Sequence, residues 1–278
     1  MPELPEVETM VRGIRQDCVE RRIDRTLFPP CPCKPIQIRP GRRAFVKQTE
    51  GKTITEIRRL AKRIVLELDS GHLIVVEPRM TGLMLITDPP TFEHRRIRFE
   101  LSPARKKAPS LEFWDRRGLG TISLLTPQQF LKLESQLGKD ALDLPVEDWI
   151  SILARTEREI KVVLLDQSCV AGIGNLYASE ILHESRISPF RAASSVSRRQ
   201  IQKLANATNR ILHEAIAYEG STLGDGTYRN ALNKDGGYQN HHRVYKRADT
   251  LCPSCGKAKI SRAVQAQRAT FYCPRCQR

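Results

Sequence analysis

Two pairs of cysteines near the end of the chain restrict its fold more than any other feature of the sequence. Cys252 and Cys255 form one C-x-x-C pair, Cys273 and Cys276 form a second, and seventeen residues separate the pairs. Two such knuckles joined by a β-hairpin can place four thiolates tetrahedrally around Zn²⁺. A closed four-Cys site leaves no open coordination position, so we expect one structural zinc ion in a separate module at residues 249–278.

The other four cysteines carry a weaker signal. Cys31 and Cys33 lie in the proline-rich stretch "FPPCPCKP", which predicts an exposed loop. We expect Cys18 and Cys169 to be packing residues, and we expect no second metal site. The chain has no apolar run of membrane-spanning length and no cationic, apolar leader at its acidic start, which predicts a cytoplasmic protein with reduced thiols.

The charge of the chain indicates a polyanionic partner. The 278 residues include 46 Lys and Arg but only 31 Asp and Glu, which gives a formal net charge of +15. An excess of this size favours nucleic acid over a generic basic surface. The hydrophobic fraction of 40% is enough to build a buried core.

The residue pattern divides the chain into an N-terminal sheet region and a later helical region. Residues 51–125 alternate apolar and polar side chains, as Ile64, Leu66 and Leu68 do, and predict a mostly antiparallel β-sandwich within residues 1–137. The stretch 137–145 resembles a linker. Helical patterns follow within residues 146–248, which end in a glycine-rich loop at 220–248. The fold class is therefore α+β.

The first residues, "MPELPEVET", predict a helix and also a reactive amine at its start. Proline and acidic residues suit a first helical turn, and apolar residues follow at helical spacing: Leu4, Val7, Val11 and Ile14. Removal of Met1 would expose the secondary amine of Pro2. An α-amino group has a pKa of about 7.7–8.0, so part of it is neutral near pH 7 and can form a Schiff base. Glu3 is placed to donate a proton, and Glu6 to hold the amine.

At this point the sequence resembles a known family, the bacterial formamidopyrimidine-DNA glycosylases. "MPELPEVET" resembles the family's N-terminus, and "RRLAKRIVLEL" resembles the strand with its catalytic lysine. "VAGIGNLYASEIL" resembles the turn of its helix–two-turn–helix element, and "AQRATFYCPRCQ" resembles its zinc-finger end. The resemblance covers the whole chain. It implies an N-terminal β-sandwich with a terminal catalytic helix, a helix–two-turn–helix domain and a zinc-finger β-hairpin.

The resemblance also implies catalytic roles for single residues. Pro2 corresponds to the Schiff-base nucleophile and Glu3 to the proton donor of base removal. Lys62 corresponds to the lysine that assists base loss and β-elimination, and Arg268 to the arginine that assists δ-elimination. For Lys62 and Arg268 taken alone, the alternative is an ordinary solvated cation.

The family flips the damaged base out of the duplex and fills the gap with side chains. The implied DNA-binding residues are His94, Arg117, Thr156, Asn175, Met80 and Leu119. Leu119 stands where the family usually has an aromatic wedge, and Thr156 stands where it often has a cation. Core packing remains the alternative for Met80 and Leu119, and a helix cap is the alternative for Asn175. The nearby cations Arg155, Arg158 and Lys161 offer further contacts, and residues 221–238 correspond to the lesion-capping loop, with Gly224 where lysine is common.

The resemblance thus implies a monomeric base excision repair enzyme that acts on double-stranded DNA with oxidised purines or abasic sites at the bacterial nucleoid. Two alternatives remain. An endonuclease VIII-like enzyme for oxidised pyrimidines usually has Gly where this chain has Leu4. A DNA-binding zinc protein without catalytic activity would not need Pro2, Glu3 and Lys62.

Overall fold

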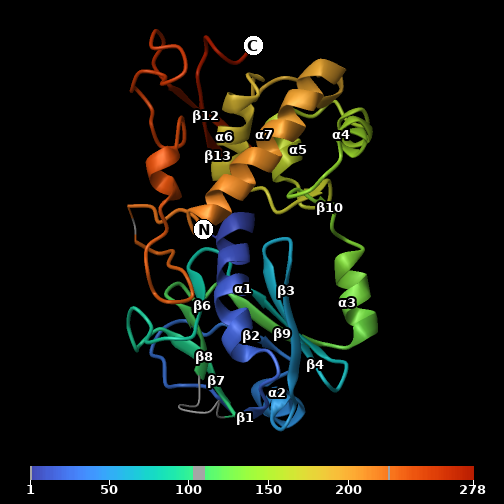
Figure 1. The fold of residues 1–278 in the computed structure, drawn as a ribbon, viewed down its shortest axis with the longest axis vertical. Helices are drawn as coiled ribbons and strands as arrows, with labels where there is room; N and C mark the ends of the chain where they lie inside the picture. The colour runs from blue at the N-terminus through green and yellow to red at the C-terminus, as the bar shows by residue number, and fades with distance from the viewer. Residues whose placement is uncertain (1, 103–109, 225) are drawn as a thin grey trace. The chain divides into compact units, whose positions relative to one another are not determined.

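The computed structural model describes residues 2–102, 110–224 and 226–278, and its chain forms two compact units (Figure 1). Unit 1 comprises Met1–Ser135 and Tyr218–Gln239, and unit 2 comprises Gln136–Ala217 and Asn240–Arg278. Residues 218–239, which include the whole of the predicted capping loop, therefore belong to the same unit as the N-terminal helix. Each unit is described separately.

Two sheets form the body of unit 1. The four-stranded sheet has the order β1-β7-β8-β6 and is antiparallel, with strands at Ile23–Leu27, Arg95–Leu101, Ser110–Asp115 and Gly82–Leu85. The five-stranded sheet has the order β2-β9-β5-β4-β3, with strands at Gln37–Arg39, Thr121–Leu125, Leu73–Glu77, Arg63–Leu68 and Ile54–Leu60. Its β2–β9 pair is parallel and the rest is antiparallel, so the sheet is mostly antiparallel, as predicted.

The alternation in β4 separates two layers of apolar packing. Ile64, Leu66 and Leu68 join the core that both sheets share, whereas Val65 packs with Phe130 on the other face of the five-stranded sheet. Phe130 lies in α3 (Pro127–Glu134), which is capped by Thr126. A third helix of this unit, α2, spans Arg42–Thr49. The predicted sandwich is confirmed, with α3 as an added cover.

Helix α1 spans Leu4–Cys18 and packs against β3, β4 and β6 (Figure 1). The apolar stripe predicted from the spacing is fully buried, and three of its four residues join the shared core: Leu4 is buried, and Val7, Val11 and Ile14 lie in the core. Burial of this stripe fixes the position of the first residues of the chain relative to the sandwich.

Unit 2 is helical at its start and ends in a β-hairpin. Its four α-helices are α4 (Val146–Leu153), α5 (Ile160–Leu165), α6 (Asn175–Glu184) and α7 (Arg198–Ala217). The stretch predicted as a linker contains β10 (Lys139–Asp140), which pairs with β11 (Val170–Ala171). Short 3₁₀ turns lie at Ala193–Ser195 and Tyr238–His241. The hairpin consists of β12 (Ser261–Gln265) and β13 (Arg268–Tyr272).

Buried charges attach the hairpin module to the helices of unit 2. Lys161 is fully buried, and its Nζ donates to the Ala269 carbonyl at 3.0 Å and to Thr270 Oγ1 at 2.7 Å. The buried Glu180 carboxylate accepts the backbone N–H groups of residues 243–245. The sequence suggested Lys161 as a DNA-contacting cation; that prediction is wrong, because its charge serves the packing of β13. Among the described residues, no helix is long and apolar enough to cross a membrane.

Candidate active site and zinc centre

The four cysteines of the two C-x-x-C pairs come together in unit 2. Their sulfur atoms all lie within 4.8 Å of one another, and Cys252–Cys276 and Cys255–Cys273 are each 3.8 Å apart. Sulfurs about 2.3 Å from a tetrahedral zinc ion would be about 3.8 Å from each other. The site therefore fits one structural zinc ion, as predicted, and it is the one cluster of this kind in the part of the chain that the structure describes.

Local backbone geometry prepares one of these thiols, Cys255, for a cation. The backbone N–H groups of Ala258 and Lys257 lower the pKa of the Cys255 thiol to about 6, which favours the thiolate that a metal requires. His183 of α6 also approaches the site, with Nε2 3.4 Å from Cys252 Sγ. The zinc-binding loops are thus connected to the helices as well as to the hairpin.

Asn175 and the hairpin residue Arg268 lie at one place in unit 2. Asn175 is the first residue of α6, and its Nδ2 donates to the carbonyl of Ala269, directly after Arg268. Gly174 is the N-cap residue of the helix. The alternative that Asn175 is a helix cap is therefore wrong. Arg268 is exposed at the start of β13, across from Gln265. An exposed cation beside a helix N-terminus suits a phosphate.

Thr156 lies apart from that pair, in the turn before α5. Its Oγ1 accepts the backbone N–H of Arg158 at 3.2 Å, and the Arg158 guanidinium pairs with Asp166 at 2.8 Å. Hydrogen bonding from Ser168, together with Arg158, lowers the pKa of Asp166 to about 2 despite partial burial. Arg155 and Arg158 are exposed, so the turn presents cations beside the threonine.

In unit 1, the first residues of the chain are held by buried carboxylates. Pro2 is buried, and Glu3 is only 3% exposed as the N-cap residue of α1. Glu6, one turn later, accepts the Glu3 N–H on its Oε2 at 2.9 Å. The same carboxylate accepts the Ser221 N–H on its Oε1 at 2.9 Å. Glu6 therefore fixes the chain start and the beginning of the capping loop to each other.

The ends of the capping loop pack closely against α1. Gly220 has a φ of +80°, and a Cβ there would lie 3.0 Å from Glu6 Cγ and from the Tyr228 ring. The Tyr228 hydroxyl donates to the Glu219 carbonyl at 3.0 Å, and burial raises its pKa well above the usual value. Gly224 is exposed with open space around it. The loop base is rigidly built, whereas Gly224 makes no close packing contact.

Lys62 lies on the turn between β3 and β4. The sequence suggested that it lies within a strand, and that prediction is wrong. The left-handed φ of +55° at Ala61 makes this tight turn. Arg59, at the end of β3, donates to the Ala61 carbonyl at 3.0 Å and pairs with Glu8 of α1 at 2.9 Å. Burial alone would raise the pKa of Glu8, but Arg12 and Arg59 lower it. This ion pair ties the lysine-bearing turn to the helix that begins beside Pro2.

Met80 and Arg117 come together at the surface of unit 1. Met80 is 39% exposed, and Arg117 Nη1 lies 2.9 Å from its sulfur. Both neighbouring turns converge on the carboxylate of Asp115, which is fully buried. It accepts the Thr81 hydroxyl, the Arg117 N–H at 3.2 Å and the Gly120 N–H at 2.8 Å. The exposure of Met80 argues against the core-packing alternative.

The remaining predicted DNA-binding residues are less exposed. Leu119 is half-buried in the same turn as Arg117. His94 is half-buried; its Nδ1 lies 2.9 Å from Thr91 Oγ1, and its ring packs 5.4 Å from the Trp114 ring. Asp115 N–H donates to the His94 carbonyl at 3.0 Å, which connects His94 to the same network.

Sequence reasoning missed the residues that hold these side chains in place. Asp115, Thr81 and Glu8 are such residues, and none of them was among the predicted site residues. Asp115 stands within "WDRRGLG", and an acidic residue beside two arginines at a strand end was the available signal. Its partner Thr81 lies 34 residues away in the sequence, so no local pattern joins them.

Comparison with family models identifies three matching domains. The N-terminal domain of formamidopyrimidine-DNA glycosylase matches residues 1–122, and the H2TH domain of that enzyme matches residues 137–226. A zinc finger found in FPG and IleRS matches residues 250–278. The three matches follow one another in this order along the chain.

Individual relatives and structures are similar over the full length. Formamidopyrimidine-DNA glycosylases of Chloroflexus aurantiacus and Herpetosiphon aurantiacus are each 36% identical, covering 100% of this chain and 98% and 100% of theirs. The crystal structure of the MutM (FPG) protein of Thermus thermophilus has a TM-score of 0.86 at 32% identity, covering 99% of this chain and 98% of that one. Lactococcus lactis FPG bound to abasic-site DNA has a TM-score of 0.86 at 29% identity, covering 99% of each chain.

Proposed function

Because the chain belongs to the formamidopyrimidine-DNA glycosylase family, we propose that it is a bifunctional DNA glycosylase and abasic-site lyase of base excision repair. Its substrates are oxidised purines, namely 8-oxoguanine and formamidopyrimidines, in double-stranded DNA. A Lactococcus lactis FPG variant with a TM-score of 0.87 and 29% identity, which covers 100% of both chains, was solved with DNA containing Fapy-dG.

The observation that carries this proposal is the buried chain start held by Glu6. Glu6 accepts the Glu3 N–H, which directs the residue before it, Pro2, along a fixed path. With Met1 removed (Met1 lies outside the described residues), the Pro2 nitrogen is a secondary amine. Its lone pair attacks C1′ of the damaged nucleotide, the C1′–N bond breaks, and Glu3 supplies a proton to the opening sugar.

The resulting iminium is an electron sink that makes strand cleavage possible. Loss of a C2′ proton expels the 3′ phosphate in β-elimination, and a second elimination expels the 5′ phosphate. Lys62 assists base loss and the first elimination, and Arg268 assists the second, since a cation stabilises the oxyanion that develops on a leaving phosphate. Lys62 lies on a turn and not in a strand, and its side chain is half-buried.

DNA binding draws on both units. His94 and Arg117 in unit 1, and Thr156, Asn175 and Arg268 in unit 2, contact the backbone of the duplex. Met80 and Leu119 fill the gap left by the flipped base together with Arg117, supported by the exposure of Met80 and its contact with Arg117. Binding weakens steeply with salt, because several phosphates are neutralised at once.

The zinc ion has a structural role in this function. Bound by the four cysteines, it holds the hairpin that presents Arg268. The protein acts as a monomer on chromosomal DNA, which places it at the nucleoid in the cytoplasm.

Borohydride trapping tests the proposal directly. Reduction of the imine should link the protein covalently to a duplex that contains 8-oxoguanine opposite cytosine, and peptide mass spectrometry should place the link at Pro2. A link formed only with thymine glycol would indicate a pyrimidine-specific enzyme. No link with either lesion, or with an abasic site, would indicate a DNA-binding protein without this chemistry.

Two variants assign the steps. Glu3→Gln should lose base removal but still be trapped on a preformed abasic site, because the amine remains. A chain that keeps Met1 should lose trapping on both substrates, because the Pro2 nitrogen is then an amide. Trapping of that chain at a lysine would contradict the role of Pro2.

A further inference from the structure

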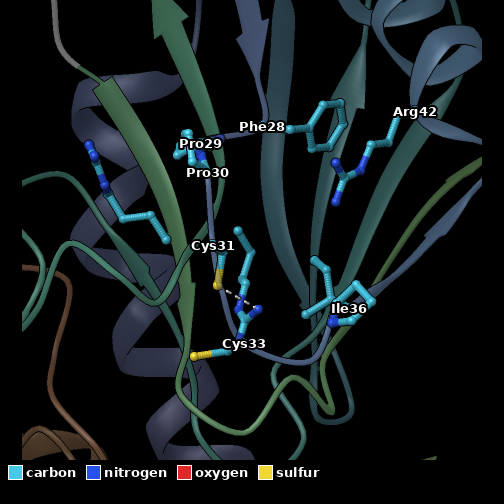
Figure 2. Close-up of a pocket in the computed structure, with 10 residues that line it drawn as sticks. Phe28, Pro29, Pro30, Cys31, Cys33, Ile36 and Arg42 are labelled. Carbon is cyan, nitrogen blue, oxygen red and sulfur yellow. Dashed lines mark hydrogen bonds between the residues drawn. The ribbon is translucent and has the colours of Figure 1, made fainter.

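A pocket in unit 1 contains two cysteines that the proposed repair chemistry does not use (Figure 2). A space of about 150 Å³ lies beside the irregular segment between β1 and β2, and Cys31 and Cys33 both line it. Both cysteines are partly exposed. Arg42, Arg95 and Arg96 also line the pocket, so the thiols lie in an electropositive environment.

One of these arginines is directed at the sulfur of Cys31. Arg96 Nη1 lies 2.9 Å from Cys31 Sγ, which Figure 2 marks with a dashed line. The guanidinium is only 4% exposed and is fixed by the Asp115 carbonyl, which accepts from Nε at 2.8 Å and Nη2 at 2.6 Å. Nη1 also donates to the Lys34 carbonyl at 2.8 Å. Two backbone carbonyls thus fix the guanidinium that contacts the Cys31 sulfur.

The second thiol is the immediate neighbour of the first. Only Pro32 separates Cys33 from Cys31 in the sequence, and both side chains line the pocket. Burial, and then Cys31 itself, raise the pKa of the Cys33 thiol, which favours its protonated form. The pair therefore combines a sulfur in contact with a buried guanidinium and a second thiol two residues further along the same pocket wall.

We propose that Cys31 and Cys33 form a thiol modification site at which a hydroperoxide produces an intramolecular disulfide. The Cys31 thiolate attacks one peroxide oxygen, the O–O bond breaks, and the alkoxide or hydroxide leaves with a proton from solvent. Cys31 becomes a sulfenic acid, a two-electron oxidation, while the peroxide is reduced to alcohol or water. The Cys33 sulfur then displaces that hydroxyl, forming the S–S bond and releasing water.

The other non-zinc cysteines provide internal comparisons. Cys18 is fully buried, and burial raises the pKa of its thiol to about 12. Cys169 also contacts a guanidinium, that of Arg158 at 3.2 Å, but it is a single cysteine. Cys169 can reach a sulfenic acid but has no neighbouring thiol among the described residues with which to form an internal disulfide.

The test treats the full-length, zinc-loaded protein with hydrogen peroxide and follows each cysteine by peptide mass spectrometry. Thiols that remain free after the peroxide treatment are alkylated before digestion, and zinc release is monitored with a chromogenic chelator. The peptide that contains Cys31 and Cys33 should lose two hydrogen atoms before zinc is released, and Cys31 should react about tenfold faster than Cys18. Zinc release before any change in this peptide would overturn the proposal.

Two matched variants separate the roles of the sulfurs. Cys33→Ser should stop at a sulfenic acid on Cys31 that dimedone captures, and Cys31→Ser should leave Cys33 in its reduced form. Addition of reductant should restore the wild-type peptide. If Cys33 instead reacts equally well in the absence of Cys31, the assignment of Cys31 as the attacking thiolate is wrong.

Discussion

Asp115→Asn tests whether one buried carboxylate holds the side chains that fill the gap in DNA. Asp115 is fully buried, and its two oxygens accept three hydrogen bonds from Thr81, Arg117 and Gly120. Asparagine keeps the shape but replaces one oxygen with an N–H₂ group, which then faces a donor. Loss of one buried hydrogen bond to a charged acceptor costs about 1.5–3 kcal/mol. We expect the free energy of unfolding of unit 1 to fall by about this amount.

The functional consequence should be specific to base flipping. The network around Asp115 positions Arg117, which in turn contacts Met80. The chain start at Pro2 and Glu3 is held separately, by Glu6. Single-turnover excision of 8-oxoguanine should therefore slow in the variant. Cleavage at a preformed abasic site, where no base has to be removed from the stack, should slow much less.

The matched control is Asp69→Asn, the same chemical change in an exposed turn. Asp69 accepts the Thr53 N–H at 3.0 Å at the surface, and we expect its substitution to change stability by less than about 0.5 kcal/mol. Urea unfolding and both kinetic assays are measured for the two variants in parallel. Equal stability of the variants, or equal slowing of both reactions by Asp115→Asn, would refute the reasoning.

Three further predictions concern other parts of the molecule. Chelation of zinc should abolish DNA binding while unit 1 keeps its thermal transition; an equal shift of that transition would contradict the modular picture. Gly220→Ala should lower the urea midpoint more than Gly71→Ala, because both have φ near +80° but only a Cβ at Gly220 meets Glu6. Burial lowers the pKa of His242 to about 4. Below about pH 6.5 the unfolded chain therefore binds a proton at this histidine, whereas the folded chain leaves it neutral. The free energy of unfolding should therefore be highest above about pH 6.5 and fall toward pH 4. Urea titrations at pH 7 and pH 5 should show a smaller fall for His242→Gln than for the wild type.

Local patterns were enough to predict several parts of this protein. The zinc ligands are two short C-x-x-C loops, and the predicted cluster was confirmed because metal geometry is encoded in that spacing. The stripe on α1 and the alternation in β4 were also confirmed, since helical and strand periods determine which side chains share a face. The family resemblance extended these patterns to the whole chain.

Other features depend on contacts that no local pattern contains. Lys161 looked like one more surface cation, but the path of β13 past α5 buries it. Lys62 was expected in a strand, and the left-handed Ala61 turns the chain there.

The sequence by itself therefore determined the N-terminal helix, the strands of the sandwich and the metal ligands. Only the tertiary structure decided that Glu6 joins Glu3 to Ser221, which lies 215 residues away. It likewise decided that Asp115 joins two turns 34 residues apart and that Arg96 faces Cys31. The physical reason is that a buried carboxylate or guanidinium takes whichever partners the folded chain brings within hydrogen-bonding distance, and that selection depends on the packing of distant segments.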